Sequence, residues 1–136
     1  MRIARELVAR LDFDRDLAGQ ARLSFDDPSL APRYAPDELA GIAQLDFRIP
    51  LDMREVIVRI VDNSDLIEFK ALYGAATVCV QAHLGGHAIG LITNNGPIDV
   101  AGANKATHFI QWMCQLGHPI IYLQNTTGYM VGKDSE

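Results

Sequence analysis

The fold is decided by residues 77–97, which read TVCVQAHLGGHAIGLITNNGP. Two runs rich in β-branched and small apolar residues flank the pair Gly85-Gly86. A two-residue hairpin turn needs positive φ at both central positions, and glycine adopts positive φ without steric strain. We therefore expect a β-hairpin whose strands cover residues 77–83 and 87–93.

The pattern continues as a helix and a third long strand. Residues 101–116 have helical spacing, and Gly117 gives the C-terminal stop. The expected buried stripe of this helix consists of Ala103, Ala106, Phe109, Ile110, Met113 and Cys114. Residues 119–124 contain the run IIYL without polar alternation, which predicts a strand buried on both faces. Gly128 and Gly132 follow, and such glycines can bring bare backbone close to a ligand.

The first quarter of the chain is less regular. Residues 2–11 place apolar side chains at helical spacing opposite a charged face, which predicts a helix. Residues 13–36 hold glycine, three prolines and scattered charges without a sustained period, which is typical of a linker. Pro36 before two acidic residues indicates the start of a short helix.

A helix and a strand are expected before the hairpin. Residues 52–62 have helical spacing, with Asp52 as the cap and Glu55 three positions later, a variant of the capping box. Its expected stripe is Met53, Val56, Ile57, Ile60 and Val61. Residues 67–70 are expected to form a strand. The spacing of apolar residues changes along the chain from a period of 3.6 residues to a period of 2 and back, which predicts an α/β fold.

Composition restricts the class of protein. With 136 residues one domain is expected, and the net charge of −5 gives no reason to expect nucleic-acid binding. No apolar run approaches the roughly 18 residues that span a membrane, and charges interrupt any signal-peptide pattern at the start. Cys79 and Cys114 are interpreted as two buried free thiols, which favours a reducing, cytoplasmic location.

Two sets of polar residues invite a functional interpretation. His83 and His87 lie near the hairpin end, where one metal ion could reach both, but no carboxylate or thiol nearby completes a ligand set, so no metal is expected. Arg54, Glu55 and Glu68 could belong to an active site. The residues alone favour a solvated helix face and a sheet edge.

Several sequence blocks, in this order and spacing, resemble the carboxyltransferase (beta) subunit of biotin-dependent acyl-CoA carboxylases. The resemblance is closest to the branch that carboxylates methylcrotonyl-CoA or geranyl-CoA. Five blocks carry it: residues 52–62, 68–74, 92–96 (ITNNG), 105–109 (KATHF) and 123–132 (LQNTTGYMVG). The family's chain is several times longer, so the resemblance implies that these residues are a fragment.

The resemblance implies a partial crotonase-like (ClpP/crotonase) ββα superhelix of the α/β class. Residues 1–36 would be a helix and linker from the preceding domain. Residues 37–136 would be the first part of the carboxyltransferase C-domain, which faces biotin. Both statements are expectations from the family.

The resemblance also implies where substrate and biotin bind. The implied binding residues are Asn94, Asn95, Gly96, Lys105, Thr127, Gly128, Tyr129 and Gly132. Asparagine amides offer donors and acceptors to a ureido ring, and a tyrosine ring offers a flat face. The plainer alternatives are a tight turn at 94–97, an exposed or ion-paired lysine, and a strand-to-helix turn whose glycines serve only geometry. No protein side chain is expected to be catalytic, because in the family biotin's own ureido oxyanion takes the proton.

The implied activity is carboxyl transfer from carboxybiotin to an acyl-CoA. Biotin would be carried by a partner alpha subunit, and sites would form between subunits of a homo-oligomer. The fragment alone is expected to be inactive, because the donors that stabilise the enolate would lie outside it. Two alternatives stay open. One is a non-catalytic folding or assembly unit, and the other is a free-standing crotonase-like protein such as a hydratase, for which no acid/base carboxylate pair is visible.

Overall fold

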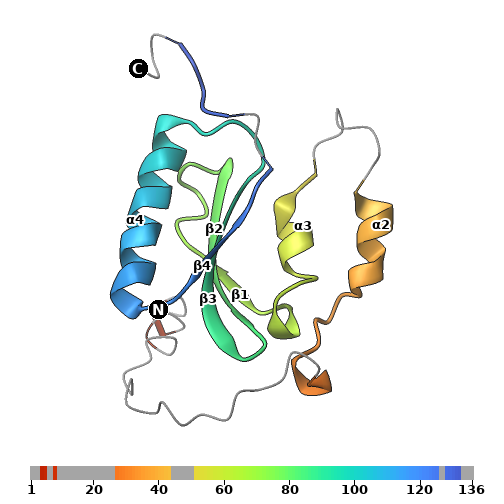
Figure 1. Ribbon diagram of the computed structural model, residues 1–136. Helices are drawn as coiled ribbons and strands as arrows, with labels where there is room; N and C mark the ends of the chain where they lie inside the picture. The colour runs from red at the N-terminus through yellow and green to blue at the C-terminus, as the bar shows by residue number, and fades with distance from the viewer. Residues whose placement is uncertain (1–3, 6–7, 9–26, 44–50, 126–127, 133–136) are drawn as a thin grey trace.

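A mixed four-stranded sheet with the order β1-β2-β3-β4 forms the centre of the fold (Figure 1). The computed structural model describes residues 4–5, 8, 27–43, 51–125 and 128–132. The strands are β1 (Leu66–Glu68), β2 (Thr77–Leu84), β3 (His87–Asn94) and β4 (Ile120–Leu123). The first three are antiparallel, and β4 runs parallel to β3 after the chain has crossed over through α4 (Val100–Leu116). The predicted α/β class and the positions of β2, β3 and β4 are confirmed.

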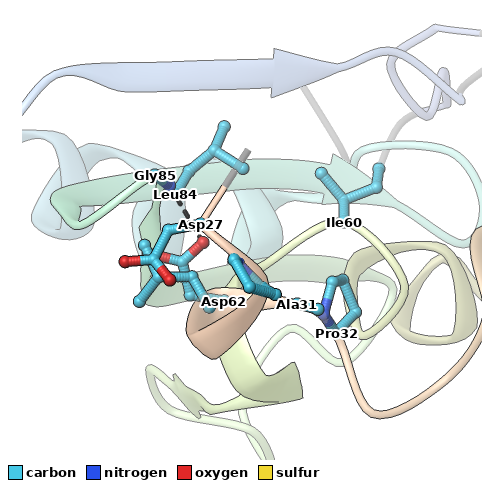
Figure 2. A pocket seen from close by; sticks show the side chains of 9 residues that line it. Asp27, Ala31, Pro32, Ile60, Asp62, Leu84 and Gly85 are labelled. Atoms are coloured by element: carbon cyan, nitrogen blue, oxygen red, sulfur yellow. Dashed lines mark hydrogen bonds between the residues drawn. The ribbon is translucent and has the colours of Figure 1, made fainter. Parts of the chain in front are cut away.

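The hairpin turn has the predicted backbone. Gly85 and Gly86 have φ of +58° and +78°, and the carboxylate of Asp62 accepts their N–H groups at 2.9 and 2.7 Å. Figure 2 shows Asp62 beside the turn, at a cavity of about 230 Å³. The second carboxylate there, Asp27, accepts the N–H of Ser29. Backbone N–H groups therefore bond to both carboxylates at this cavity.

Helices cover both faces of the sheet (Figure 1). Alternate residues of β2 point to opposite faces: Cys79 packs with Phe109 and Met113 of α4, while its neighbours Val78 and Val80 pack with the other core. Gly90 of β3 permits the close approach of α4. A Cβ atom there would lie 2.8 Å from Met113 Cγ and 3.0 Å from Phe109 Cε1.

The helix predicted over 52–62 is shorter than expected. The structure has α3 (Met53–Ile57) followed by turns and the 3₁₀ helix η3 (Asp62–Ser64). Asp52 caps the start of α3, as predicted, because its side chain accepts the N–H of Arg54. The β-branched residues that follow restrict χ1 and favour helix weakly. The Ser64 hydroxyl donates to Val58 O at 2.6 Å, across the turns that follow α3.

Short elements precede α3. They are the 3₁₀ helices η1 (Pro28–Leu30) and η2 (Pro36–Glu38), which continues into α2 (Leu39–Ile42). The predicted helix start at Pro36 is therefore confirmed. Of the helix predicted over 2–11, residues 4, 5 and 8 are helical, and the rest lie outside the described residues, as does most of the linker. Arg59 joins η2 to α3, since its guanidinium donates to Glu38 and Glu55.

Two strand predictions need correction. The strand expected over 67–70 ends at Glu68, because the backbone turns at Lys70, where φ is +47°. β4 was expected to be buried on both faces, but it is an edge strand in the described part of the chain. Tyr122 is 61% exposed there, and the other three residues of β4 are half-buried. An uninterrupted apolar run therefore predicts a strand, but it does not predict whether other elements cover both faces of that strand.

The prediction of two buried thiols is half wrong. Cys79 of β2 is buried against α4, whereas Cys114 is exposed. The residues of α4 that face the sheet are Gly102, Lys105, Phe109 and Met113. Cys114 follows Met113 by one residue, which rotates it about 100° away from the sheet.

Thiol reactivity checks this placement. In the native chain at pH 8 we expect Ellman's reagent to modify Cys114 rapidly and Cys79 only after unfolding, because burial raises the pKa of the Cys79 thiol to about 11. The Cys114→Ser variant should lose the rapid phase and keep the slow one. Two rapid thiols in the native wild type would contradict the fold.

Candidate functional site

A groove lies between α4 and the carboxyl ends of β3 and β4, with a volume of about 500 Å³. We call it the α4–β4 groove. Its apolar wall comes from Ala103, Ala106 and Ile110 of α4, together with Leu123 of β4. Its polar lining comes from Thr77, Asn94, Thr107, Tyr122, Gln124 and Tyr129. An apolar cavity with a few polar groups is the usual form of a small-molecule site.

Three of the predicted binding residues meet at this groove: Asn94, Gly128 and Tyr129. Ile98 holds residues 128–130 in place. Its N–H donates to Gly128 O at 3.0 Å, and its carbonyl accepts from Met130 N at 2.8 Å. Tyr129 is 73% exposed, so much of its ring is open to a ligand or partner. The structure thus brings residues from opposite ends of the predicted set together.

The two asparagines have different surroundings. Asn94 ends β3, is buried, and donates through Nδ2 to Thr77 Oγ1 at 2.9 Å. Its carbonyl accepts from Asn125 Nδ2 at 3.0 Å, which joins the end of β3 to the segment after β4. Asn95 instead points to α3, where its amide bonds to Met53 N and Asp52.

Gly96, Lys105 and Gly132 are not among the residues that line the groove. Gly96 follows in the same loop and is half-buried, and Gly132 is exposed with φ of +146°. Thr127 lies outside the described residues. Lys105 is on the face of α4 that packs against the sheet, not the face that walls the groove. A ligand-binding role for these four residues stays a prediction.

Lys105 is fully buried, which the sequence interpretation of a solvent charge did not expect. Its Nζ lies 3.6 Å from Glu68 Oε1 and makes no hydrogen bond to the described part of the chain. Burial lowers the pKa of Lys105, and the nearby Glu68 carboxylate opposes that shift. The alternative of an ion-paired lysine is the one that the structure bears out.

Arg54, which is partly buried, is the third member of this charge cluster. Its Nε and Nη2 donate to the two oxygens of Glu68 at 2.8 and 2.7 Å, a bidentate pair. The sequence interpretation treated both as solvated, and no local pattern could pair residues on different elements. One signal was available for Lys105, because it lies four residues before Phe109 on the buried stripe.

The histidine pair cannot share one metal ion. His83 pairs across the hairpin with Ala88, while His87 pairs with Leu84. Adjacent pairs point to opposite faces of a sheet, so the two imidazoles diverge. In the part of the chain that the structure describes, no three His, Cys, Asp or Glu side chains gather where they could hold a metal ion. None of the described helices is long and apolar enough to cross a membrane.

Comparison with known sequences identifies the family. Residues 2–136 match the carboxyl transferase domain. A probable biotin-dependent acyl-coenzyme A carboxylase beta2 subunit from Mycobacterium tuberculosis is 44% identical over 137 residues, covering 100% of this chain and 25% of that one. A probable mitochondrial methylcrotonoyl-CoA carboxylase beta chain from Drosophila melanogaster is 41% identical over 145 residues, covering 98% and 25%.

Comparison with solved structures gives the same family. The beta subunit of P. aeruginosa geranyl-CoA carboxylase is similar with a TM-score of 0.76 and 42% identity, covering 98% of this chain and 25% of that one. The transcarboxylase 12S structure has a TM-score of 0.70 and 29% identity, covering 74% and 21%. The chain spans about a quarter of the length of these relatives. Its α/β fold is the partial crotonase-like fold that the sequence blocks implied, and the chain belongs to the carboxyl transferase domain family.

Proposed function

We propose that this chain is part of the carboxyltransferase subunit of a biotin-dependent acyl-CoA carboxylase of the methylcrotonyl-CoA or geranyl-CoA type. The observation that carries the proposal is a difference in sequence identity between two groups of relatives. Methylcrotonyl-type beta chains are 41–46% identical to this chain. A methylmalonyl-CoA carboxyltransferase, a long-chain acyl-CoA carboxylase beta4 subunit and a glutaconyl-CoA decarboxylase subunit are only 28–30% identical.

The α4–β4 groove is the part of the biotin-side site that this chain contributes. Its volume of about 500 Å³ lies within the range of small-molecule sites. The apolar wall suits the bicyclic ring and chain of biotin, and the amides of Asn94 and Gln124 suit its ureido group. Biotin supplies the transferable carboxyl group when it is bound. Residues of this chain bind and orient it, with the exposed Tyr129 ring at the mouth.

The other components of the proposal lie outside this chain. They are an acyl-CoA substrate, an alpha subunit that carries biotin, and further copies of the same subunit, in the cytoplasm. Stabilising an enolate needs preorganised N–H donors. In the proposal these donors come from other parts of the complete subunit, so no residue described here has a catalytic role.

Filling the groove tests this function. In the complete subunit that contains this sequence, Ala106→Trp is expected to raise the KM for free biotin by about tenfold or more, because the indole occupies the groove. The assay is carboxylation of free biotin from a carboxylated acyl-CoA, the reverse reaction. Asn104→Trp is the matched control, since Asn104 is on the same helix but exposed and outside the groove. Equal KM values for the two variants would refute the assignment of the groove.

A further inference from the structure

The loop at Asn94, Asn95 and Gly96 is tied to the start of α3 through its middle residue. The Oδ1 atom of Asn95 accepts from Met53 N at 2.9 Å, and its Nδ2 donates to Asp52 Oδ1 at 2.7 Å. Its backbone N–H donates to Ala76 O at 2.7 Å. Both ends of this side-chain amide are therefore engaged by the protein.

Asp52 receives several donors on one oxygen. Its Oδ1 accepts from Arg54 N at 3.0 Å and from Arg54 Nη1 at 3.3 Å, in addition to Asn95. Burial raises the pKa of Asp52, but these hydrogen bonds together outweigh burial and hold its pKa below the ordinary value. Asp52 is therefore a carboxylate at neutral pH and acts only as an acceptor.

Arg54, one of the two partners of Asp52, is held in place by its own contacts. The planar guanidinium of Arg54 is held by both oxygens of Glu68, and a bidentate pair restricts its rotamer. Glu68 also lies 3.6 Å from Lys105 on α4, the helix that walls the groove. Ionic contacts thus connect the start of α3, β1 and α4, and the hydrogen bonds of Asn95 join the loop to them.

We infer that Asp52 is a positioning residue that holds the loop beside the α4–β4 groove through the side chain of Asn95. Asn95 then supports the site rather than contacting a ligand, while Asn94 lines the groove. A loop of asparagines and glycine has several accessible backbone conformations, so an anchor removes an ordering cost on binding. This inference rests on the proposed function of the groove.

Kinetics of the complete subunit test the inference. Asp52→Ala is expected to raise the KM for free biotin about tenfold, which is the loss of one hydrogen bond to a charged group. The KM for the carboxylated acyl-CoA should change by less than about twofold, because that substrate does not depend on this loop in the proposal. Asp52→Asn keeps an acceptor oxygen and should restore most of the affinity for biotin.

A matched control separates loop positioning from the loss of a helix cap. Asp27 also accepts the N–H two residues later, at 2.9 Å, and starts η1 well away in sequence from the loop. Asp27→Ala should leave both KM values unchanged. A double-mutant cycle adds a second criterion: Asp52→Ala with Asn95→Ala should cost no more than the larger single change. Additive effects, or a biotin KM that Asp52→Ala does not alter, would overturn the inference.

Hydrogen exchange gives a readout that does not need activity. In the complete subunit, amides of residues 92–98 should exchange faster in Asp52→Ala than in wild type, and near the wild-type rate in Asp52→Asn and Asp27→Ala. If the subunit transfers no carboxyl group, the proposed function is wrong, and this measurement still decides whether Asp52 holds the loop. Unchanged exchange in Asp52→Ala would show that it does not.

Discussion

Glu68→Ala is expected to lower the free energy of unfolding by about 3–5 kcal/mol, because it leaves a buried charge without its partner. Lys105 is fully buried, and Glu68 is the acidic side chain of its ion pair in the structure. The same change removes the two Glu68 oxygens that accept from the Arg54 guanidinium and leaves Asp52 as its acceptor. Chemical denaturation at pH 7 measures the loss.

The loss should depend on pH in a defined direction. The pKa of Lys105 in the folded chain is already lowered by burial, and removing Glu68 lowers it further. Between that lowered pKa and the ordinary lysine value of 10.5, the unfolded chain then binds more protons than the folded chain. Stability therefore rises with pH in that range, and the deficit of Glu68→Ala should shrink between pH 7 and pH 10.

A second substitution isolates the cause. Lys105→Met removes the buried charge, so adding it to Glu68→Ala should recover part of the lost stability. Asp37→Ala is the control, since Asp37 is an exposed carboxylate of η2 and should change stability by less than about 0.5 kcal/mol. Equal losses from Glu68→Ala in the presence and absence of Lys105 would contradict this account.

Gly74→Ala is expected to cost roughly 2–5 kcal/mol, combining left-handed strain with overpacking. Gly74 has φ of +52°, and a Cβ atom there would lie 2.7 Å from Gly102 N and 2.8 Å from Ala101 C. Both contacts are with backbone at the start of α4, which cannot move aside as a side chain can. Thermal unfolding of the variant should show the loss as a lowered Tm.

The control for this change is another glycine with positive φ. Gly132 has φ of +146°, and no atom of the described chain lies within 4 Å of the position that a Cβ would take there. Gly132→Ala should therefore lose only the conformational part of the effect. A loss for Gly74→Ala no larger than that for Gly132→Ala would mean that crowding against α4 is unimportant.

Features set by neighbouring residues could be predicted from the sequence. The Gly85-Gly86 turn needs only local backbone freedom, and α4 needs only a 3.6-residue period, so both were predicted closely. The five sequence blocks also predicted the family. The length of α3 was overestimated, because Asp62 bonds to the hairpin turn, far away in sequence.

Features set by distant partners could not be predicted. The amide of Asn95 bonds to Met53 and Asp52, which lie 42 and 43 residues away, and no local pattern pairs residues so far apart. Lys105 was weighed as a solvent charge, although its place on the buried stripe already argued for burial. The exposure of Tyr122 depends on what covers the outer edge of β4, which the strand itself does not encode.

The order of the strands has a consequence for folding kinetics. Every strand of the sheet pairs with the strand next to it in the chain, and the two antiparallel pairs are joined by short loops. A hairpin such as β2–β3 can form in about 1–10 μs, whereas parallel pairing of β4 must wait for the whole α4 crossover. We expect β4 and the groove beside it to assemble last. Substitutions there should then accelerate unfolding in stopped-flow experiments while leaving the folding rate nearly unchanged.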